Sequence, residues 1–498
     1  MTHALLASLF VVATCGLVYE LVAGALASYL LGDTVLQFST VIGAYLFAMG
    51  VGSWLSKFVG RGLASRFVQI EILVGLVGGW SAALLFLTFT YAAGFRLVLY
   101  LLVLLVGTLV GMEIPLLMRL LKGKLEFKDL VSQVLTVDYL GALGASILFP
   151  LLLVPHLGLL NTAFVFGLLN VGVAALALRI LRDEIPDAAR LKAGCAAAAA
   201  LLAAGLAGSR VIADHAEGSL YADEVVFAKT TAYQRIVLTR WKDDWRLFLN
   251  GHLQFSTMDE YRYHEALVHP ALSAHPRPRR VLILGGGDGL AAREVLRDPR
   301  VKEVTLVDLD PGMTGLFASH PELSRLNGGA LRDPRVSVVN ADAFKWLESS
   351  LGGFDAAIVD FPDPSNFSVG KLFSAPFYRL LKRRMAKGGL ISVQATSPLF
   401  ARRSFWCIEK TMADAGWTTA PYHAYVPSFG EWGFVIGAEK PYRAPLRLPE
   451  GLRYLTTATL PSLFEFPADM SRVDAEVNRL DTQALVRYYE AEWEKVVQ

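Results

Sequence analysis

The first half of the chain consists of long apolar runs separated by short polar segments. Six runs are each about long enough to cross the roughly 30 Å hydrocarbon core of a bilayer as a helix. A further run, Ala193–Ser209, is mostly alanine and glycine and gains little from insertion. The pattern predicts a multi-pass α-helical membrane domain over residues 1–212, with six or seven spans. The strong runs lie near residues 4–24, 36–56, 67–91, 95–118, 139–155 and 158–178.

From about Leu220 the pattern changes to the alternation that is typical of β-strands. Short runs at Glu224–Lys229, Tyr233–Leu238 and Trp245–Leu249 are followed by a turn at Asn250–Gly251. They predict a small antiparallel β lid over residues 218–257.

The region 258–440 begins with a helical stretch, Asp259–His269, and continues with apolar strand patterns that alternate with helical ones. Alternation of this kind predicts a Rossmann-like α/β domain of the class I methyltransferase type, in which the carboxyl ends of the parallel strands share one edge. Residues 441–498 are expected to be a tail without chemistry, helical near 483–496. The expected strands are Val281–Leu284, Val304–Val307, Val336–Asn340, Phe354–Val359, Gly388–Val393 and an antiparallel Trp432–Gly437.

Composition agrees with membrane insertion and excludes several classes of function. The chain has 54% hydrophobic and 18% charged residues, which is too apolar for a soluble enzyme of this size. A net charge of +2 gives no electrostatic case for nucleic-acid binding. The three cysteines, Cys15, Cys195 and Cys407, lie far apart, so neither a disulfide framework nor a Cys-x-x-C metal site is expected.

Basic residues concentrate in alternate loops of the membrane half, around residues 57–66, 119–128 and 179–192. By the positive-inside rule these loops and the N-terminus face the cytoplasm. Six spans leave the C-terminal half in the cytoplasm, whereas seven export it. We expect a multi-pass cell-membrane protein with a cytoplasmic catalytic domain, and Ala193–Ser209 lying on the membrane surface or packed on the bundle.

A glycine turn directly follows the strand at 281–284 and precedes a helical pattern at 290–296. Glycines at Gly285, Gly287 and Gly289 let the backbone approach a ligand, and the helix directs its positive N-terminus at the same place. Asp308 ends the next strand, about 20 residues on, where an acidic side chain can bind both hydroxyls of a ribose. The pattern indicates a nucleoside site.

Acidic residues follow several of the expected strands. They share the ligand crevice at the carboxyl edge of the sheet, and together they favour a ligand that carries positive charge. These residues are Asp288, Asp308, Asp342, Asp360 and Asp363.

Six sequence blocks follow one another in the second half of the chain: Leu249–Gln254, Asp259–Glu265, Gly285–Gly289, Val307–Pro311, Asn340–Phe344 and Asp360–Pro364. In this order they resemble the spermidine synthase (polyamine aminopropyltransferase) family, and the membrane half is similar to its multi-pass bacterial members. The resemblance implies transfer of an aminopropyl group from decarboxylated S-adenosylmethionine to putrescine, giving spermidine and methylthioadenosine. Both ligands are substrates, and no cofactor or metal is implied.

The resemblance also implies roles for the donor site. Asp308 would bind the ribose, Asp342 the adenine amine and Asp288 the aminopropyl ammonium group. Gln234 and Gln254 match glutamines that line this site. Asp288 favours the decarboxylated donor, because intact S-adenosylmethionine carries a carboxylate that an adjacent acid repels.

On the acceptor side, Asp360 resembles the catalytic carboxylate, which must deprotonate the attacking amine. Asp363 would hold that end of the amine, and Tyr263 and His264 match a pair that contacts the aminopropyl and acceptor region. The segment Val426–Phe434, which contains Trp432, resembles the family's loop over the acceptor.

Three positions depart from the family pattern and leave the acceptor open. Phe361 and Pro362 replace small serines, and Phe429 replaces a tyrosine that usually helps to bind the amine.

We single out three acids that lie within expected spans or at their ends: Glu20, Glu113 and Asp138. Intramembrane carboxylates are candidates for function. They either fix helix packing, by pairing with each other or with a base such as Arg119, or form a cation site for polyamine.

Two other functions stay open: a methyltransferase with the same core fold, and a membrane polyamine carrier or sensor. The lipid bilayer is an expected partner, and homo-oligomer formation is left open.

Overall fold

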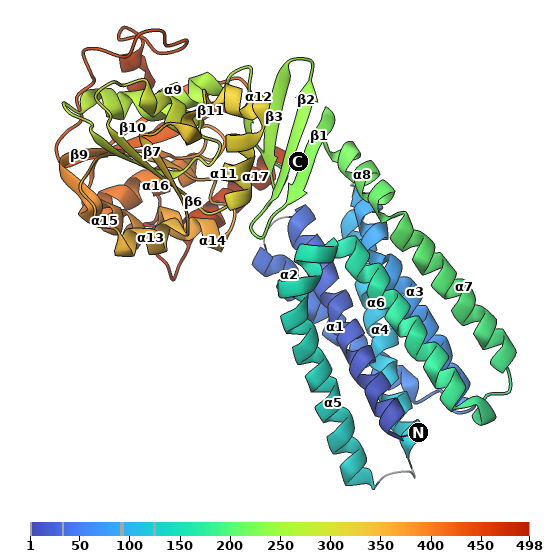
Figure 1. The fold of residues 1–498 in the computed structure, drawn as a ribbon. Helices are drawn as coiled ribbons and strands as arrows, with labels where there is room; N and C mark the ends of the chain where they lie inside the picture. Colours follow the sequence, from blue (N-terminus) through green and yellow to red (C-terminus); the bar gives the residue numbers. More distant parts are fainter. Residues whose placement is uncertain (1, 32–33, 90–93, 123–125, 498) are drawn as a thin grey trace. The chain divides into compact units, whose positions relative to one another are not determined.

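The computed structural model describes residues 2–31, 34–89, 94–122 and 126–497 (Figure 1). Residues 90 and 91 of the expected span 67–91 lie outside this set. The chain forms two compact units, Met1–Asp223 and Glu224–Gln498.

Long apolar helices make up the first unit. By length and composition, six helical stretches of the described residues are able to cross a membrane, and one of them, Phe127–Ile180, takes in both α5 and α6. Gly158, inside α6, has a φ of 74°, which interrupts the helical course and divides this long stretch into two helical segments. The unit consists of α1 Thr2–Leu31, α2 Thr34–Ser56, α3 Leu63–Phe89, α4 Phe95–Leu121, α5 Phe127–Leu148, η1 Phe149–Leu153, α6 Val154–Ile180, η2 Arg182–Glu184, α7 Ala188–Ala207 and α8 Ser209–Leu220.

Helix α7, which contains most of the marginal run, packs along α3 and α6. Gly205 lies against Phe164, and Leu202 lies so close to Gly167 and Gly79 that a Cβ at either glycine would meet its side chain. Moving forward along α7 therefore means moving backward along α6, so the two helices are antiparallel. Small residues permit this close approach.

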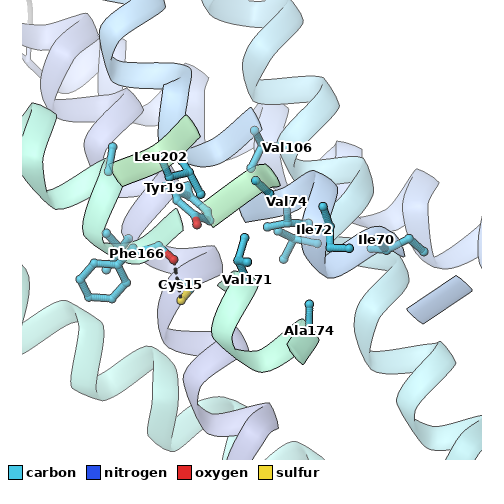
Figure 2. Packing of buried hydrophobic residues seen from close by; sticks show 14 of the residues in the cluster. Cys15, Tyr19, Ile70, Ile72, Val74, Val106, Phe166, Val171, Ala174 and Leu202 are labelled. Atoms are coloured by element: carbon cyan, nitrogen blue, oxygen red, sulfur yellow. Dashed lines mark hydrogen bonds between the residues drawn. The ribbon is translucent and has the colours of Figure 1, made fainter. Parts of the chain in front are cut away.

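A buried polar network joins three helices of the bundle. The Asn170 amide donates to Oε2 of Glu71 at 2.8 Å, and the Tyr19 hydroxyl donates to Oδ1 of Asn170 at 3.0 Å. Figure 2 shows Tyr19 among apolar side chains of α1, α3 and α6, near the contact between the Cys15 thiol and the Phe166 carbonyl. Glu71 was absent from the acids singled out in the sequence, although it lies within the expected span 67–91 and carries the same signal as Glu20 and Glu113.

One of the alternatives left open for the acids of the first unit is pairing with Arg119, which is not observed among the described residues. Its guanidinium donates instead to the carbonyl oxygens of Ser56 and Val59, at 2.9 and 2.6 Å, where α2 ends. Glu113 is buried, and its Oε1 atom accepts no hydrogen bond from the described residues.

The second unit begins with an antiparallel sheet of order β1-β2-β3-β4. Asn250 and Gly251 form the turn between β3 and β4, with φ of 51° and 83°. The sequence analysis missed the last strand, because it is short and directly follows this turn. The strands are β1 Glu224–Thr230, β2 Arg235–Trp241, β3 Asp244–Leu249 and β4 His252–Ser256.

The larger sheet has the order β10-β11-β9-β8-β5-β6-β7 among the described residues. Strands β5 to β9 are parallel, while β11 runs antiparallel to β9 and to β10. This is a Rossmann-like, methyltransferase-type fold. Its strands are β5 Arg280–Gly285, β6 Glu303–Asp308, β7 Val336–Asn340, β8 Phe354–Asp360, β9 Met385–Gln394, β10 Thr418–Val426 and β11 Gly430–Ala438.

Helices cover both faces of this sheet, and strand residues alternate between two cores (Figure 1). Ile283 packs with α9 and α10, whereas Leu282 and Leu284 pack with α15 and α16. The helices are α9 Glu260–Ala274, α10 Leu290–Leu296, α11 Pro311–Ser319, α12 Pro321–Leu326, α13 Ala343–Ser349, α14 Phe367–Gly370, α15 Ala375–Arg384, α16 Arg402–Asp414 and α17 Ala484–Val497.

The last part of the chain packs onto the same unit. Leu455 and Leu460 join one core and Leu485 the other. The buried carboxylate of Glu265 accepts hydrogen bonds from three backbone N–H groups, of residues 453–455, at 2.7 to 3.0 Å. These contacts hold the tail against α9.

Candidate active site

The site is built on the glycine turn after β5. Gly285, Gly286 and Gly289 have φ of 82°, 64° and 78°, a region that residues with a Cβ rarely adopt. Gly287 is needed for another reason, because a Cβ there would lie 2.7 Å from the Asp308 carboxylate. The turn therefore lets the strand ends and their acids approach the backbone closely.

Three carboxyl groups surround this turn. Asp308, at the end of β6, accepts from the N–H groups of Gly287 and Asp310 at 3.1 and 2.8 Å. Asp288 lies in the turn, and its Oδ1 accepts from the N–H of Leu290 at 2.8 Å. Asp360 ends β8, directly opposite Gly285 in the register of β5 and β8. The topology thus brings together acids that are far apart in the sequence.

Burial of these acids makes their charged form less stable than it is in an exposed carboxyl group. Burial raises the pKa of Asp288 to about 6, and burial likewise raises the pKa of Asp308 to about 6. Burial also raises the pKa of Asp360 above its ordinary value. A bound ammonium or sulfonium group would offset this desolvation by direct charge pairing.

Asp360 is oriented by α9. The Tyr263 hydroxyl donates to its Oδ1 at 2.7 Å. Burial and the nearby Asp360 raise the pKa of Tyr263 well above its usual range, so the hydroxyl keeps its proton. The other oxygen, Oδ2, lies over the glycine turn, 3.1 Å from where a Cβ of Gly286 would be. It accepts no hydrogen bond within the described part of the chain, and it is available to a ligand.

His264 is held by a charged network that the sequence analysis missed. Its Nδ1 donates to Oε2 of Glu260 at 2.9 Å, and Arg293 donates to both oxygens of the same carboxylate at 2.9 Å. Burial alone would lower the pKa of His264, but the bond to Glu260 outweighs it and raises the pKa to about 9. His264 is therefore a cation at neutral pH. The spacing of Glu260 and His264, four residues apart in a helical stretch, was the available signal.

Asp363 is held by neighbours from two distant segments. Thr396 Oγ1 donates to its Oδ2 at 3.1 Å and Gln394 Nε2 to its Oδ1 at 3.4 Å. Tyr489 of α17 also hydrogen-bonds to it. Burial raises the pKa of Asp363 to about 6 despite these bonds. Thr396 has a φ of 57°, which is strained for a β-branched residue and common near ligand sites.

Aromatic rings from β11 and the preceding turn pack around Tyr263. The Phe434 ring lies 5.4 Å from it, the Phe429 ring 6.2 Å and the Trp432 ring 6.5 Å. Trp432 Nε1 is buried and has no hydrogen-bond partner among the described residues. Phe361 packs instead against Phe373 and Phe377, so this bulky replacement lies in the core.

The remaining site candidates form hydrogen bonds or ion pairs with other residues of the chain. Gln234 Nε2 donates to Asp310 at 2.9 Å, so it contacts the residue that supports Asp308. Gln254 donates to carbonyl groups of its own strand, those of residues 252 and 253. Asp342 caps α13 and pairs with the ammonium group of Lys371 at 2.6 Å. Because hydrogen bonds already occupy Asp342, an adenine amine would have to compete with Lys371.

Comparisons with known proteins identify close relatives. A family described as "Spermine/spermidine synthase domain" matches residues 260–446. The chain is 54% identical to a "Polyamine aminopropyltransferase" of Leptospira interrogans, over 100% of both chains. It is 57% identical to "Polyamine aminopropyltransferase 2" of Ralstonia nicotianae, covering 99% of this chain and 98% of the relative.

A solved spermidine synthase in complex with the transition-state analogue AdoDATO is 25% identical. The match covers 49% of this chain and 86% of that one, with a TM-score of 0.46.

Proposed function

The chain belongs to the polyamine aminopropyltransferase (spermidine synthase) family, and we propose that it transfers the aminopropyl group of decarboxylated S-adenosylmethionine to putrescine. Transferase activity of this class is shared by the whole-length relatives. What we propose is the identity of the donor and the acceptor and the role of each residue. The observation that supports this proposal is that Asp288, Asp308 and Asp360 lie together around the glycine turn.

The donor brings a sulfonium, a ribose and a primary ammonium group. Asp308 is placed to accept hydrogen bonds from the ribose hydroxyls, and Asp288 to pair with the ammonium group. Gln234 supports this side through Asp310, which donates its N–H to Asp308. Gln254 and Asp342 contact the donor only if they give up their present partners, which are backbone carbonyl groups for Gln254 and Lys371 for Asp342.

The reaction requires a neutral amine as nucleophile. Putrescine arrives as an ammonium ion, so Asp360 Oδ2 first accepts one N–H proton, and the lone pair that this frees on nitrogen then attacks the methylene next to sulfur. The carbon–sulfur bond breaks with its electron pair going to sulfur, so methylthioadenosine leaves as a neutral thioether. A carboxylate with a raised pKa is a better base near neutral pH than an ordinary aspartate. Tyr263 holds Asp360 during this step, and Asp363 and Trp432 lie on the acceptor side.

The same charges argue against methyl transfer from intact S-adenosylmethionine. Its carboxylate would meet a group of buried acids, whereas the decarboxylated donor brings no negative charge to them. The purified full-length protein, given putrescine and the decarboxylated donor, is expected to release methylthioadenosine. Release of only S-adenosylhomocysteine, from intact S-adenosylmethionine, would replace this function by methyl transfer.

For the membrane placement, we propose that α7 crosses the bilayer as well. The expectation of a cytoplasmic catalytic unit assumes six crossings. Gly158 divides Phe127–Ile180 into two helices, and α7 runs antiparallel to α6 over most of its length. Seven crossings place Glu224 on the side opposite the basic loops.

A further inference from the structure

A cavity of about 690 Å³ lies between α6 and α7. This volume falls within the range of about 300–1,000 Å³ that is typical of small-molecule sites. Its walls are apolar and mostly small, including Leu168, Val171, Gly172 and Ala175 of α6 and Ala196 and Ala199 of α7. At Gly172 an added Cβ would meet nothing within 4 Å, so the space beside this residue is open.

One end of the same cavity is basic. It is lined by Arg179 in the last turn of α6, Arg182 at the start of η2 and Lys192 early in α7. All three side chains are exposed, and within the described part of the chain none has an ion-pair partner. The acids of the connecting turn, Asp183, Glu184 and Asp187, do not line the cavity.

The dimensions fit one leaflet of a membrane. From Leu168 to Arg179, α6 rises about 16 Å at 1.5 Å per residue. Half of a roughly 30 Å hydrocarbon core is about 15 Å. If the apolar walls lie at the depth of the acyl chains, the three cations therefore lie at the depth of the lipid headgroups.

We propose that this cavity, called the α6–α7 groove below, binds an anionic phospholipid. An acyl chain would lie between α6 and α7, and the phosphate would lie between Arg179, Arg182 and Lys192. A neutral lipid would leave the three cations unpaired, and free phosphate would leave the apolar walls unfilled. The proposal rests on insertion of the bundle in a bilayer, and it is independent of the reaction at Asp360.

Native mass spectrometry of the full-length protein in detergent tests the site, by titration with phosphatidylglycerol, phosphatidylcholine or inorganic phosphate. We expect phosphatidylglycerol to bind in preference to the other two. Each cation near anionic lipid is worth about 1 kcal/mol, or about fivefold in affinity, so R179Q/R182Q/K192Q should weaken binding by at least about tenfold. The matched control R61Q/R66Q/R190Q removes the same charge outside the groove and should bind like wild type.

A second variant tests the apolar part without altering charge. G172L places a side chain in the open space and should also reduce phosphatidylglycerol binding. Circular dichroism and the thermal unfolding midpoint of the same preparations check that each variant is folded. Equal binding of phosphatidylglycerol and phosphatidylcholine, equal losses in the two triple variants, or unchanged binding in folded G172L would each overturn the proposal. Binding of inorganic phosphate as tight as that of the lipid would do so too.

Discussion

The hydroxyl of Tyr263 donates a 2.7 Å hydrogen bond to Oδ1 of Asp360, joining α9 to the end of β8. The bond fixes the carboxylate with Oδ2 over the glycine turn, where Gly286 has no side chain to block it. Tyr263 is thus a positioning residue for the proposed base. Its own position is set by the aromatic rings of β11 and by its neighbour His264.

Tyr263→Phe should lower kcat by about tenfold to a hundredfold, since a hydrogen bond to a charged group contributes about 1.5–3 kcal/mol. The donor KM should change little, because Asp288 and Asp308 keep their contacts. The bond also lowers the pKa of Asp360, so the acid limb of the pH–kcat profile should move to higher pH. Tyr425→Phe, at an exposed tyrosine, is the control. An unshifted acid limb would show that Tyr263 does not act through Asp360.

Donor binding should weaken as pH falls through about 6, where Asp288 and Asp308 become protonated. The pKa of such a carboxyl is 3.8 in the unfolded chain and about 6 in the folded protein without donor. Its contribution to the stability of the donor-free protein is therefore complete below pH 3.8 and is lost as the pH rises through about 6. A bound cationic donor pairs with the ionised carboxylates and so restores the stability that is lost at higher pH. The increase in Tm on adding donor should therefore be larger at pH 7.5 than at pH 5. An equal increase at both values would contradict the charge pairing.

Asp308→Ala should weaken donor affinity by about 1.5–3 kcal/mol, because charge-assisted bonds to the ribose are lost. The donor KM should rise accordingly, while kcat at saturation is largely retained. Asp474→Ala, at an exposed surface ion pair, controls for loss of an acid. If the donor KM of Asp308→Ala equals that of wild type, the nucleoside binds elsewhere.

Tyr489→Phe tests the contribution of α17. Losing this hydrogen bond should raise the pKa of Asp363 above about 6 and reduce its charge at neutral pH. The acceptor KM should rise severalfold, by the roughly 0.5–1.5 kcal/mol of one hydrogen bond, and the donor KM should stay constant. A rise in the donor KM instead would place Asp363 on the donor side.

Alkaline phosphatase fused after Asp223 tests the seven crossings. The fusion should be active in intact cells, because α7 then carries the boundary to the side opposite the basic loops. A second fusion after Arg182 should be inactive. Inactivity of both fusions would restore six crossings and a cytoplasmic catalytic unit.

The parts of the fold that sequence predicted best are those with a strong local pattern. Leu290–Leu296 follows from its glycine turn and α17 from its amphipathic repeat, and both match the expected ranges. The strand ends that carry Asp308 and Asp360 were also predicted, because buried parallel strands are continuous apolar runs. By contrast, β4 was missed, since five residues after a tight turn carry little periodic signal.

The candidate site was less predictable, because hydrogen-bond partners depend on tertiary contacts. Nothing local to Asp342 indicates that Lys371 reaches it from the 3-10 helix η4 Lys371–Phe373. Tyr489 lies more than a hundred residues beyond Asp363, in a tail to which no chemistry was assigned. Glu71, which is fully buried, was predictable as an acid within the expected span 67–91, but its partner Asn170 was not, because that contact depends on the packing of α3 against α6.

The central claim, that Asp360 is the base in aminopropyl transfer, is tested most directly by Asp360→Asn. The full-length variant and wild type are compared for methylthioadenosine release from the decarboxylated donor and putrescine, and donor binding is measured by calorimetry. The substitution preserves size and removes the proton acceptor. Turnover should fall by about two to four orders of magnitude, with donor binding retained. A variant that binds donor normally and keeps more than about a third of the wild-type rate would contradict the account.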